Sequence, residues 1–454
     1  MLNPNIFREY DIRGVAETDL PSEGVTGLGR ALGTFLRRRG ARRVNLGRDV
    51  RLSGERLNAA LTAGLLAAGV DVADLGPVPT PVLYYSVYKL GAEAGVMITG
   101  SHNPPEYNGF KTMLGHGTIY GDQIQEVLRI LRSGDFENGA GRLSQADAIT
   151  PYVEEIPAQF KFPRRVKVVF DAGNGAAGPT LGRILDRLNV EAVRMYFEPD
   201  GSFPNHHPDP TVETNLEALK RAVLEHGAEM GLAFDGDSDR IGAVDEQGRV
   251  IWGDMLMLIF GREILGRKPG ATFIGEVKCS QVMYDELERL GGRPIMYKTG
   301  HSLIKAKMKE ERAELAGEMS GHMFFADRYY GFDDALYAAC RLIEIVAGSG
   351  RPLSAQLEGV PRMVVTPEMR FDCPDASKFA VVERVRAHYT GRRKVIGVDG
   401  VRVVFDKGWG LVRASNTQPI LVLRFEAETP TLLEQYRSEV EAVVAEAARA
   451  EGLG

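Results

Sequence analysis

Cysteine is scarce in this chain of 454 residues. The three cysteines, Cys279, Cys340 and Cys373, are odd in number and far apart, and no Cys-x-x-Cys pair occurs. Such usage favours reduced thiols in a cytosol over a disulfide framework. The polar N-terminal residues lack the apolar stretch of a signal peptide, and no apolar run approaches the roughly 20 residues that span a membrane. We therefore expect a cytoplasmic protein with no membrane partner.

An excess of positive charge is also missing. The formal net charge is −6, with 26% charged and 44% hydrophobic residues, which is ordinary for a soluble globular enzyme. We therefore expect no nucleic-acid partner, and an anionic ligand would have to meet positive charge gathered locally. The nearest approach to a phosphate-binding Walker loop, residues 261–268, lacks the Gly-Lys-Ser/Thr ending, so nucleotide hydrolysis has no support.

One pattern recurs along the chain. Strand-like runs begin at residues 43, 166 and 272, and each is followed by a polar loop, a helix with an apolar stripe and a second strand. Each copy is a βαβ-type unit, and an α/β protein presents its functional groups on the polar loops at the strand ends. The last part of the chain instead combines short strands with helices over residues 376–389 and 431–450, as in an α+β domain.

We therefore predict an α/β fold with three related α/β domains, which have mixed sheets, and a C-terminal α+β domain. A rough allowance of ~150 residues per domain gives three domains, or four smaller ones, for this length. The predicted domains cover residues 1–148, 149–250, 251–361 and 362–454.

Ser101 lies in the stretch Thr-Gly-Ser-His-Asn-Pro, which follows the apolar, strand-like residues 94–98. Pro104 and Pro105 prevent a helix from starting at once, so we expect Ser101 on an irregular loop at the end of a strand. Three interpretations of this serine are open at this point: a turn residue whose hydroxyl bonds its own backbone, a hydrolase nucleophile, or a carrier of a phosphoryl group.

Three carboxylates, Asp235, Asp237 and Asp239, follow an apolar run within five residues and form the strongest chemical signal of the chain. At an effective dielectric of ~20, two such charges ~4 Å apart repel by roughly 4 kcal/mol, and a cation removes that cost. Hard oxygen ligands favour Mg²⁺ or Ca²⁺. An EF-hand is disfavoured because Arg240 stands where that loop needs glycine. The arginine also adds a positive charge suited to phosphate.

The remaining polar stretches are weaker when each is taken alone. Residues 317–322, with Glu318 and Ser320, suit sugar hydroxyls but fit a plain loop equally well. Residues 413–419 combine an arginine fork with hydroxyls and free N–H groups, as in a phosphate cradle. By itself, Arg13 before a glycine favours a surface turn over an anion ligand.

These stretches are weak one by one, but their joint occurrence in a fixed order is specific. TGSHNP, DGDSDR, GEMSGH and RASNTQP occur in this order, and YDIRG, NGFK, EVKCS and KTGH accompany them. Over essentially its whole length the chain resembles the α-D-phosphohexomutase family, and its phosphomannomutase/phosphoglucomutase branch in particular. The phosphoglucosamine mutase branch more typically has Gln where Met319 stands and Gly where Asn416 stands. The resemblance implies four domains around a central cleft, which contribute in order a phosphoserine loop, a metal loop, a sugar loop and a phosphate loop.

The resemblance also implies a reaction. Ser101 would be carried as phosphoserine, and Mg²⁺ would be held by the three aspartates and by an oxygen of that phosphate. The phosphoryl group would pass to a hexose 1- or 6-phosphate, and a hexose 1,6-bisphosphate would form and return its other phosphate to Ser101. The rival readings are a phosphoglucosamine mutase, a non-catalytic sugar-phosphate-binding protein and a serine hydrolase; the hydrolase lacks the Gly-x-Ser-x-Gly elbow.

The family's roles carry over onto matching positions of this sequence. For the reacting phosphate and the general base, the resemblance implies Arg13, Lys111, Arg240, His301 and His322, with the base left open between Lys111 and His322 and with His301 as a further histidine. For the substrate it implies Tyr10, Lys278, Glu318, Ser320, His322, Arg413, Ser415, Asn416 and Thr417. The sequence is consistent with a monomer or a homodimer.

Overall fold

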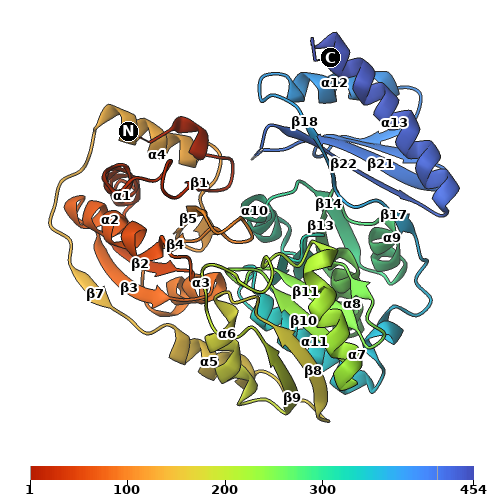
Figure 1. The fold of residues 1–454 in the computed structure, drawn as a ribbon, viewed down its shortest axis with the longest axis horizontal. Coiled ribbons are helices and arrows are strands. Elements are labelled where there is room, and N and C mark those ends of the chain that lie inside the picture. Colours follow the sequence, from red (N-terminus) through yellow and green to blue (C-terminus); the bar gives the residue numbers. More distant parts are fainter. Residues whose placement is uncertain (1, 417, 454) are drawn as a thin grey trace.

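The structure is a computed structural model that describes residues 2–416 and 418–453. Thr417, one of the predicted phosphate-loop residues, therefore lies outside the described residues. The described chain forms four sheets, one after another along the sequence (Figure 1). Within this part of the chain, no helix is both long and apolar enough to cross a membrane.

The first sheet is mixed and has the strand order β1-β5-β4-β2-β3-β7, with β6 paired to β5. Its central strand β2 runs parallel to both of its neighbours, whereas β5 is antiparallel to β4 and β1. The strands are β1 (Ile12–Val15), β2 (Arg43–Arg48), β3 (Asp71–Pro77), β4 (Ala94–Ile98), β5 (Tyr107–Leu114), β6 (Gly117–Thr118) and β7 (Leu143–Gln145), and the helices are α1 (Ser22–Arg37), α2 (Gly54–Ala67), α3 (Thr80–Lys89) and α4 (Asp122–Ser133).

The second and third sheets repeat this plan on a smaller scale, with the orders β12-β11-β10-β8-β9 and β14-β13-β15-β16. The second unit comprises α5 (Ile149–Ala158), β8 (Val166–Asp171), α6 (Ala177–Leu185), β9 (Val190–Met195), α7 (Glu217–His226), β10 (Met230–Phe234), β11 (Ile241–Asp245) and β12 (Val250–Ile251). The third comprises α8 (Gly253–Arg267), β13 (Thr272–Glu276), α9 (Gln281–Arg289), β14 (Arg293–Tyr297), α10 (His301–Glu311), β15 (Leu315–Gly317), β16 (Met323–Phe325) and α11 (Ala335–Ser349).

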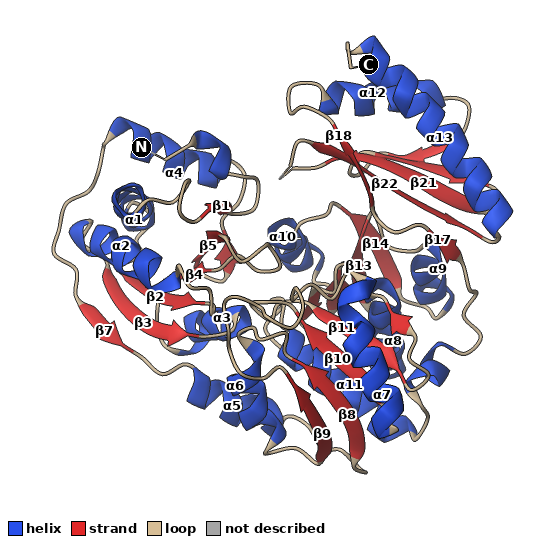
Figure 2. Cartoon of the chain, viewed as in Figure 1, coloured by secondary structure: helices blue, strands red, loops and turns tan. Residues whose placement is uncertain are grey.

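The last sheet is antiparallel throughout, and helices α12 and α13 lie together against it (Figure 2). Its strands are β17 (Val364–Val365), β18 (Met369–Asp372), β19 (Lys394–Ile396), β20 (Val401–Phe405), β21 (Gly408–Ala414) and β22 (Ile420–Ala427), and the helices are α12 (Lys378–Tyr389) and α13 (Pro430–Ala450). The predicted fold class, three α/β units and a terminal α+β unit, is confirmed.

The three predicted βαβ units are confirmed as well. The parallel pairs β2/β3, β8/β9 and β13/β14 are each joined by one helix, and their first strands begin at residues 43, 166 and 272. Each helix buries the leucines of its apolar stripe, such as Leu61, Leu181 and Leu287. The polar loops that follow the first strands lie at the carboxyl edge of each sheet, which is the edge that faces the site described below.

Hydrophobic packing joins the units unequally. One large core runs through the second and third units and includes α3 of the first, whereas the last unit has a core of its own. A small cluster of Val277, Trp409 and Leu411 connects the third and fourth units. The buried guanidinium of Arg402 lies over the Trp409 ring and donates to the main-chain oxygens of Val277 and Cys279.

One local expectation needs correction. Arg13 lies within strand β1, paired with β5, and not on a surface turn, because the backbone of β5 supplies the partners of this short segment. Of the other predicted site residues, His301 is the first residue of helix α10, and Arg413 lies inside β21, which extends to Ala414.

Candidate active site

Ser101 follows strand β4 and is almost completely buried, at 2% exposure. Its φ is +49°, in the left-handed region that a residue with a side chain rarely adopts. The side-chain hydroxyl donates to Oδ2 of Asp235 at 2.8 Å and lies 3.1 Å from Nδ1 of His102. Ser101 of the first unit therefore faces a carboxylate of the second unit.

The three aspartates occupy the turn between β10 and β11, which form an antiparallel hairpin. Asp235, Asp237 and Asp239 are fully buried, and one oxygen of each lies within 4.8 Å of the others. The main-chain N–H groups of Asp239 and Arg240 donate to Oδ1 of Asp235 and fix its orientation. A side chain at Gly236 would come within 2.5 Å of the Ser101 carbonyl oxygen, so a glycine here permits the two loops to touch.

The aspartate cluster fits a hard divalent cation. Oδ1 of Asp237 and Oδ1 of Asp239 are buried and have no hydrogen-bond partner among the described residues. Burial, together with the charges of Asp237 and Asp239, raises the pKa of Asp235 well above its ordinary value. Oxygen donors alone, crowded and partly unpaired, are the set that Mg²⁺ accepts.

Lys111 projects from strand β5 into the same cluster. Its Nζ lies 2.8 Å from Oδ2 of Asp237 and 2.5 Å from Oδ2 of Asp239. Burial lowers the pKa of this lysine, but the two carboxylates outweigh it and raise the pKa above its usual value. The side chain is therefore an ammonium that donates, which suits charge neutralisation better than acceptance of a proton.

His322 lies on the other side of the aspartates. Nε of Arg240 donates to Nε2 of His322 at 3.0 Å, and Nδ1 of the ring lies 3.0 Å from Oδ2 of Asp333. Since arginine can only donate, Nε2 is an acceptor and Nδ1 carries the hydrogen. Nδ1 faces the carboxylates of Asp239 and Asp333, at 3.6 and 3.0 Å, without a hydrogen bond to either among the described residues, and the spacing of the three groups would also allow a metal ion.

Two further buried groups complete this side of the site. Nζ of Lys305 lies 3.0 Å from Oδ1 of Asp333, and the ring of His301 stacks on that of His322 with centroids 5.9 Å apart. Burial lowers the pKa of Lys305, and burial together with the Lys305 charge lowers the pKa of His301 well below its ordinary value. His301 is therefore held neutral.

Arg13 supports the serine loop from strand β1. Its Nη1 donates to Oδ1 of Asn103 at 2.6 Å and to the carbonyl oxygen of Gly100 at 3.4 Å, and its Nη2 lies 2.6 Å from Oδ2 of Asp11. The guanidinium thus lies beside the serine loop, where a phosphate on Ser101 would find a positive charge.

The predicted sugar loop joins β15 to β16. Oε1 of Glu318 accepts from the N–H of Gly300 at 2.8 Å, and Oε2 accepts from the Ser320 hydroxyl at 3.0 Å. Gly300 has a φ of +130°, and a side chain there would meet the ring of Tyr10 at 2.5 Å. The glycine therefore lets the third unit approach the first.

The residues of the predicted phosphate loop contact the other units. Nδ2 of Asn416 donates to the Tyr10 hydroxyl at 2.7 Å, and that hydroxyl donates to the carbonyl oxygen of Thr299 at 2.7 Å. Nε of Arg413 donates to Oδ2 of Asp399 at 3.0 Å. Ser415 is buried, and its hydroxyl accepts from the N–H of Gln418 at 3.1 Å.

Lys278 is buried where the third unit meets the last. Its Nζ lies 3.0 Å from Oε2 of Glu368, and the lysine charge lowers the pKa of Glu368 to about 2. The main-chain N–H of Lys278 donates to Oε2 of Glu276, which also accepts from the Thr299 hydroxyl.

Hydrogen bonds connect the predicted loops to one another. Ser101 joins the serine loop directly to the metal loop through Asp235, and Arg240 joins the metal loop to the sugar loop through His322. Tyr10 links the first, third and fourth units.

Sequence reasoning missed several buried residues of this region. Asp49 and Arg51 contact the serine loop, Asp333 and Lys305 lie behind His322, and Asp399 holds Arg413. A signal existed for the first pair, because it lies in the polar loop after the first strand of the first βαβ unit. No local pattern distinguishes the other three from ordinary surface charges.

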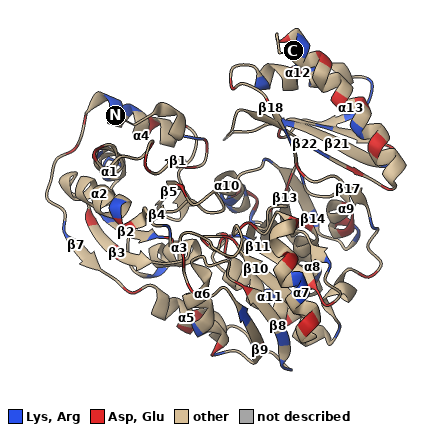
Figure 3. Cartoon of the chain, in the orientation of Figure 1, with Lys and Arg blue, Asp and Glu red and all other residues tan. Residues whose placement is uncertain are grey.

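Lys, Arg, Asp and Glu are interspersed over all four units (Figure 3).

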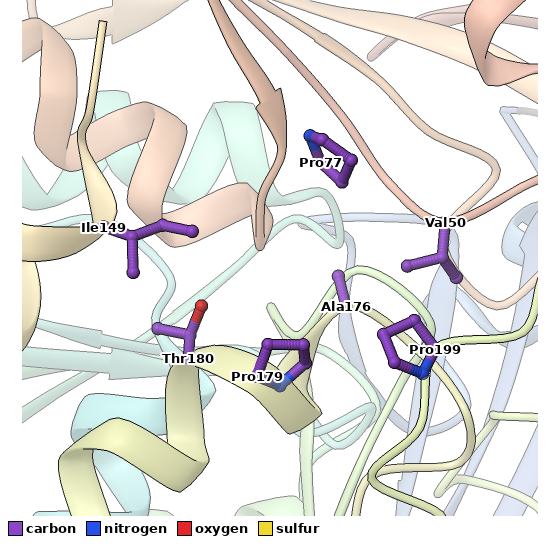
Figure 4. A pocket seen from close by; sticks show the side chains of 7 residues that line it. All are labelled: Val50, Pro77, Ile149, Ala176, Pro179, Thr180 and Pro199. Atoms are coloured by element: carbon purple, nitrogen blue, oxygen red, sulfur yellow. The ribbon is translucent and has the colours of Figure 1, made fainter.

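One pocket lies apart from the predicted site residues. A largely apolar pocket of about 290 Å³ lies between the first and second units, lined by Val50, Pro77, Ile149 and Pro199 among others (Figure 4). None of the predicted site residues lines this pocket.

Fold and site together define a four-unit enzyme in which a buried serine of the first unit faces an aspartate cluster of the second. Models of the phosphoglucomutase/phosphomannomutase family match all four units: α/β/α domain I at residues 4–138, domain II at 150–248, domain III at 252–363 and the C-terminal domain at 368–443. The chain belongs to the phosphoglucomutase/phosphomannomutase family, and the predicted membership in the α-D-phosphohexomutases is confirmed.

Individual relatives agree with this assignment. The chain is 45% identical over 447 residues to the phosphomannomutase/phosphoglucomutase of Pseudomonas aeruginosa, with 97% of this chain and 96% of that protein covered. It is 43% identical to a phosphoglucomutase of Neisseria gonorrhoeae, with the same shares covered. A crystal structure of a phosphoglucomutase/phosphomannomutase family protein from Burkholderia thailandensis superposes with a TM-score of 0.93, at 44% identity and 98% coverage of both chains.

Proposed function

We propose that this protein is a phosphohexomutase that moves a phosphoryl group reversibly between the 1- and 6-positions of mannose or glucose phosphates. The relatives named above, at 43–45% identity over nearly the whole chain, support this activity. One observation of the site carries it furthest: the Ser101 hydroxyl is buried and directed at the aspartate cluster, with 2.8 Å between Oγ and Oδ2 of Asp235. A phosphate on Ser101 would meet that cluster.

The residues present fit a Mg²⁺ ion held by Asp235, Asp237, Asp239 and an oxygen of a phosphorylated Ser101. When bound, such an ion neutralises charge that develops on the transferring phosphoryl group. Arg13 beside the serine loop, and Lys111 and Arg240 beside the aspartates, supply positive charge for the phosphoryl group. Phosphoryl transfer needs this positioning and charge stabilisation more than covalent help from the protein.

The forward step breaks the bond between the Ser101 oxygen and phosphorus, and a substrate hydroxyl forms the new bond. A hexose 1,6-bisphosphate results, and the protein must accept the proton of the substrate hydroxyl and deliver a proton to the departing Ser101 oxygen, so that no net proton is gained or lost. We assign the role of base to His322, because its Nε2 has a lone pair whereas the Lys111 ammonium has none. That lone pair accepts from Nε of Arg240 in this structure, so His322 acts as the base only once Arg240 has turned from the ring to the phosphate. In the second step the bisphosphate returns its other phosphate to Ser101.

The remaining predicted residues bind the sugar and the phosphate that does not react. Glu318 and Ser320 present oxygens suited to vicinal hydroxyls near the middle of the sugar. Arg413, Ser415 and Asn416 form the cradle for the distal phosphate, and the loop also contains Thr417. Tyr10 and Lys278 flank this cradle from the first and third units.

Two measurements test the proposal. After incubation with a hexose 1,6-bisphosphate, the intact mass of the protein should include a fraction with one phosphate, and Ser101→Ala should show none. Rates with Mg²⁺ on mannose, glucose and glucosamine 1-phosphates should be highest for the first two. Absence of the phosphorylated fraction would rule out the mutase, and a dominant rate on the amino sugar would identify a phosphoglucosamine mutase instead.

A further inference from the structure

We infer that Arg51, with Asp49, is a positioning residue of the mutase reaction: it holds the main chain of the Ser101 loop in the one conformation that presents the serine to the metal loop. The inference rests on the proposed function. Neither side chain was predicted from sequence, and neither touches Ser101 Oγ among the contacts of the described residues.

The main chain of the serine loop surrounds the side chain of Arg51, which comes from the loop after β2. Its side chain is fully buried, and the guanidinium donates to four main-chain oxygens. The acceptors are Ser101 (2.9 Å), Asn103, Pro104 and Tyr107 (2.9 Å). The loop thus turns its carbonyl oxygens inward around one cation, which leaves the Ser101 hydroxyl on the outer side. A planar fork can satisfy several oxygens at once, and a lysine ammonium cannot match that geometry.

Asp49 completes the arrangement from the same strand end. Its Oδ2 accepts from the Thr99 hydroxyl at 2.7 Å and from the N–H of Gly100 at 3.1 Å, and it lies 3.2 Å from Nε of Arg51. The Thr99 hydroxyl in turn accepts from the N–H of Ser101 at 2.8 Å. The carboxylate therefore holds the N–H side of the loop while the guanidinium holds the carbonyl side.

The loop needs this support because its conformation is strained. A left-handed φ at a residue with a side chain is unfavourable and persists only where the surroundings impose it. Gly100 lies so close to the Arg51 guanidinium that a Cβ would come within 2.3 Å of Cζ. The backbone of the loop is thus packed directly onto the cation, with no side chain between them.

A segment of the second unit covers the other side of Arg51. The Phe203 ring lies 5.3 Å from the guanidinium, and a side chain at Gly201 would clash with the main chain of Val50 and Arg51. The unit that carries the aspartates therefore also presses on the residue that holds the serine loop. Arg51 holds the carbonyl side of the Ser101 main chain, and this fixes where the Ser101 hydroxyl lies relative to Asp235.

Such a role predicts a specific kinetic effect. Within the described part of the chain, the side-chain hydrogen bonds and ion pair of Arg51 go to the serine loop, to Tyr107 and to Asp49, and none goes to the predicted sugar loop or phosphate loop, so its loss should leave substrate binding almost unchanged. Misplacement of the phosphoserine should slow both transfers between protein and sugar. The expected signature is a fall in kcat with little change in KM.

Arg51→Lys tests this, because it keeps the charge and removes the fork. The matched control is Arg341→Lys, since Arg341 is also fully buried, donates to the carbonyl oxygen of Asp327 and lies in α11 away from the serine. We expect kcat of Arg51→Lys to fall at least 30-fold with KM within threefold of the wild type. The control should keep kcat within threefold, and a ³¹P NMR resonance of the phosphoserine should shift in Arg51→Lys only.

Equal kcat in Arg51→Lys and the wild type, an equal loss in both variants, or a parallel rise in KM would overturn the inference. If Arg51→Lys does not fold, Asp49→Asn decides by the same criteria, because it weakens the same loop from the N–H side. A wild-type protein that never carries phosphate on Ser101 would instead refute the proposed function, so the two failures are distinguishable.

Discussion

Asn416 donates a hydrogen bond to the hydroxyl of Tyr10 at 2.7 Å, although 406 residues separate them along the chain. The same hydroxyl donates to the carbonyl oxygen of Thr299 at 2.7 Å. One phenol therefore joins the first, third and fourth units at the centre of the site. Burial raises the pKa of Tyr10 there, so the group stays a neutral donor over the working pH range of an enzyme.

Tyr10→Phe removes both of these hydrogen bonds and keeps the ring that packs against Gly300. Each such bond contributes about 0.5–1.5 kcal/mol, so we expect kcat/KM to fall about tenfold. Steady-state kinetics on glucose 1-phosphate measures the change. Tyr436→Phe is the control, because the Tyr436 hydroxyl lies in the last unit and makes no hydrogen bond within the described part of the chain. An unchanged kcat/KM in Tyr10→Phe would show that the link between the units is not used.

Lys111→Met removes the ammonium that bridges Asp237 and Asp239. Two buried carboxylates then lack their cation, and breaking a buried pair costs about 3–5 kcal/mol. We expect the melting temperature without metal to fall by several degrees, and added Mg²⁺ to raise it more in the variant than in the wild type. Thermal melts with EDTA and with Mg²⁺ measure both effects.

Lys220→Met is the matched control for that experiment, because Lys220 bridges two exposed glutamates on the surface, where such pairs contribute little. Its melting temperature should not depend on Mg²⁺ more than that of the wild type. If Mg²⁺ stabilises Lys111→Met no more than the wild type, the lysine does not compensate the aspartate cluster.

Glu318→Gln tests the sugar loop separately from the serine. The carboxylate is aligned by Gly300 and Ser320, and a charged acceptor binds a hydroxyl more strongly than a neutral one. We expect KM for the hexose phosphate to rise about tenfold, since hydrogen bonds to charged groups contribute about 1.5–3 kcal/mol. The fraction of protein phosphorylated on Ser101 should not change, as measured by intact mass. A fall in that fraction with constant KM would place Glu318 in the transfer step and not in sugar binding.

The sequence was most informative where function follows from local chain geometry. Three βαβ units, their polar loops and the spacing of the aspartates are all properties of short segments, and the structure contains each of them. Ser101 and Asp235 meet because both follow buried strands of neighbouring units, at the edge where strand ends collect side chains. Periodicity and residue type predicted the units, their polar loops and the aspartate cluster, whereas the resemblance to the family implied that Ser101 and the aspartates share one site.

Contacts between the units could not be derived in the same way. Whether Lys111 reaches Asp237, or Arg51 holds four oxygens of a loop some 50 residues later, depends on how separate sheets pack. Arg13 shows the same limit on a smaller scale, because its four-residue strand exists only through pairing with β5. Such partners are chosen by tertiary packing, which local propensity does not encode.

Asp334 predicts a pH effect on stability. It caps helix α11 through the N–H of Tyr337 and accepts from the hydroxyls of Tyr152 and Tyr329 at 2.8 and 2.6 Å. Burial raises its pKa to about 6, despite these hydrogen bonds. The native state thus binds the proton more tightly than the unfolded chain, so the free energy of unfolding falls as the pH rises from about 4 to about 6 and then levels off.

Asp334→Asn measures this contribution, because an amide keeps an acceptor for the helix N–H and cannot ionise. The pKa difference of about two units corresponds to about 3 kcal/mol at ~1.36 kcal/mol per unit. Part of this contribution is already lost at pH 4.5, so urea unfolding at pH 4.5 and pH 7 should show a decrease in stability with pH that is about 2 kcal/mol larger in the wild type than in the variant. Taking the difference between the two proteins cancels the other titrating groups. Parallel pH dependences would mean that the Asp334 carboxylate is as easily ionised in the folded protein as in the unfolded chain.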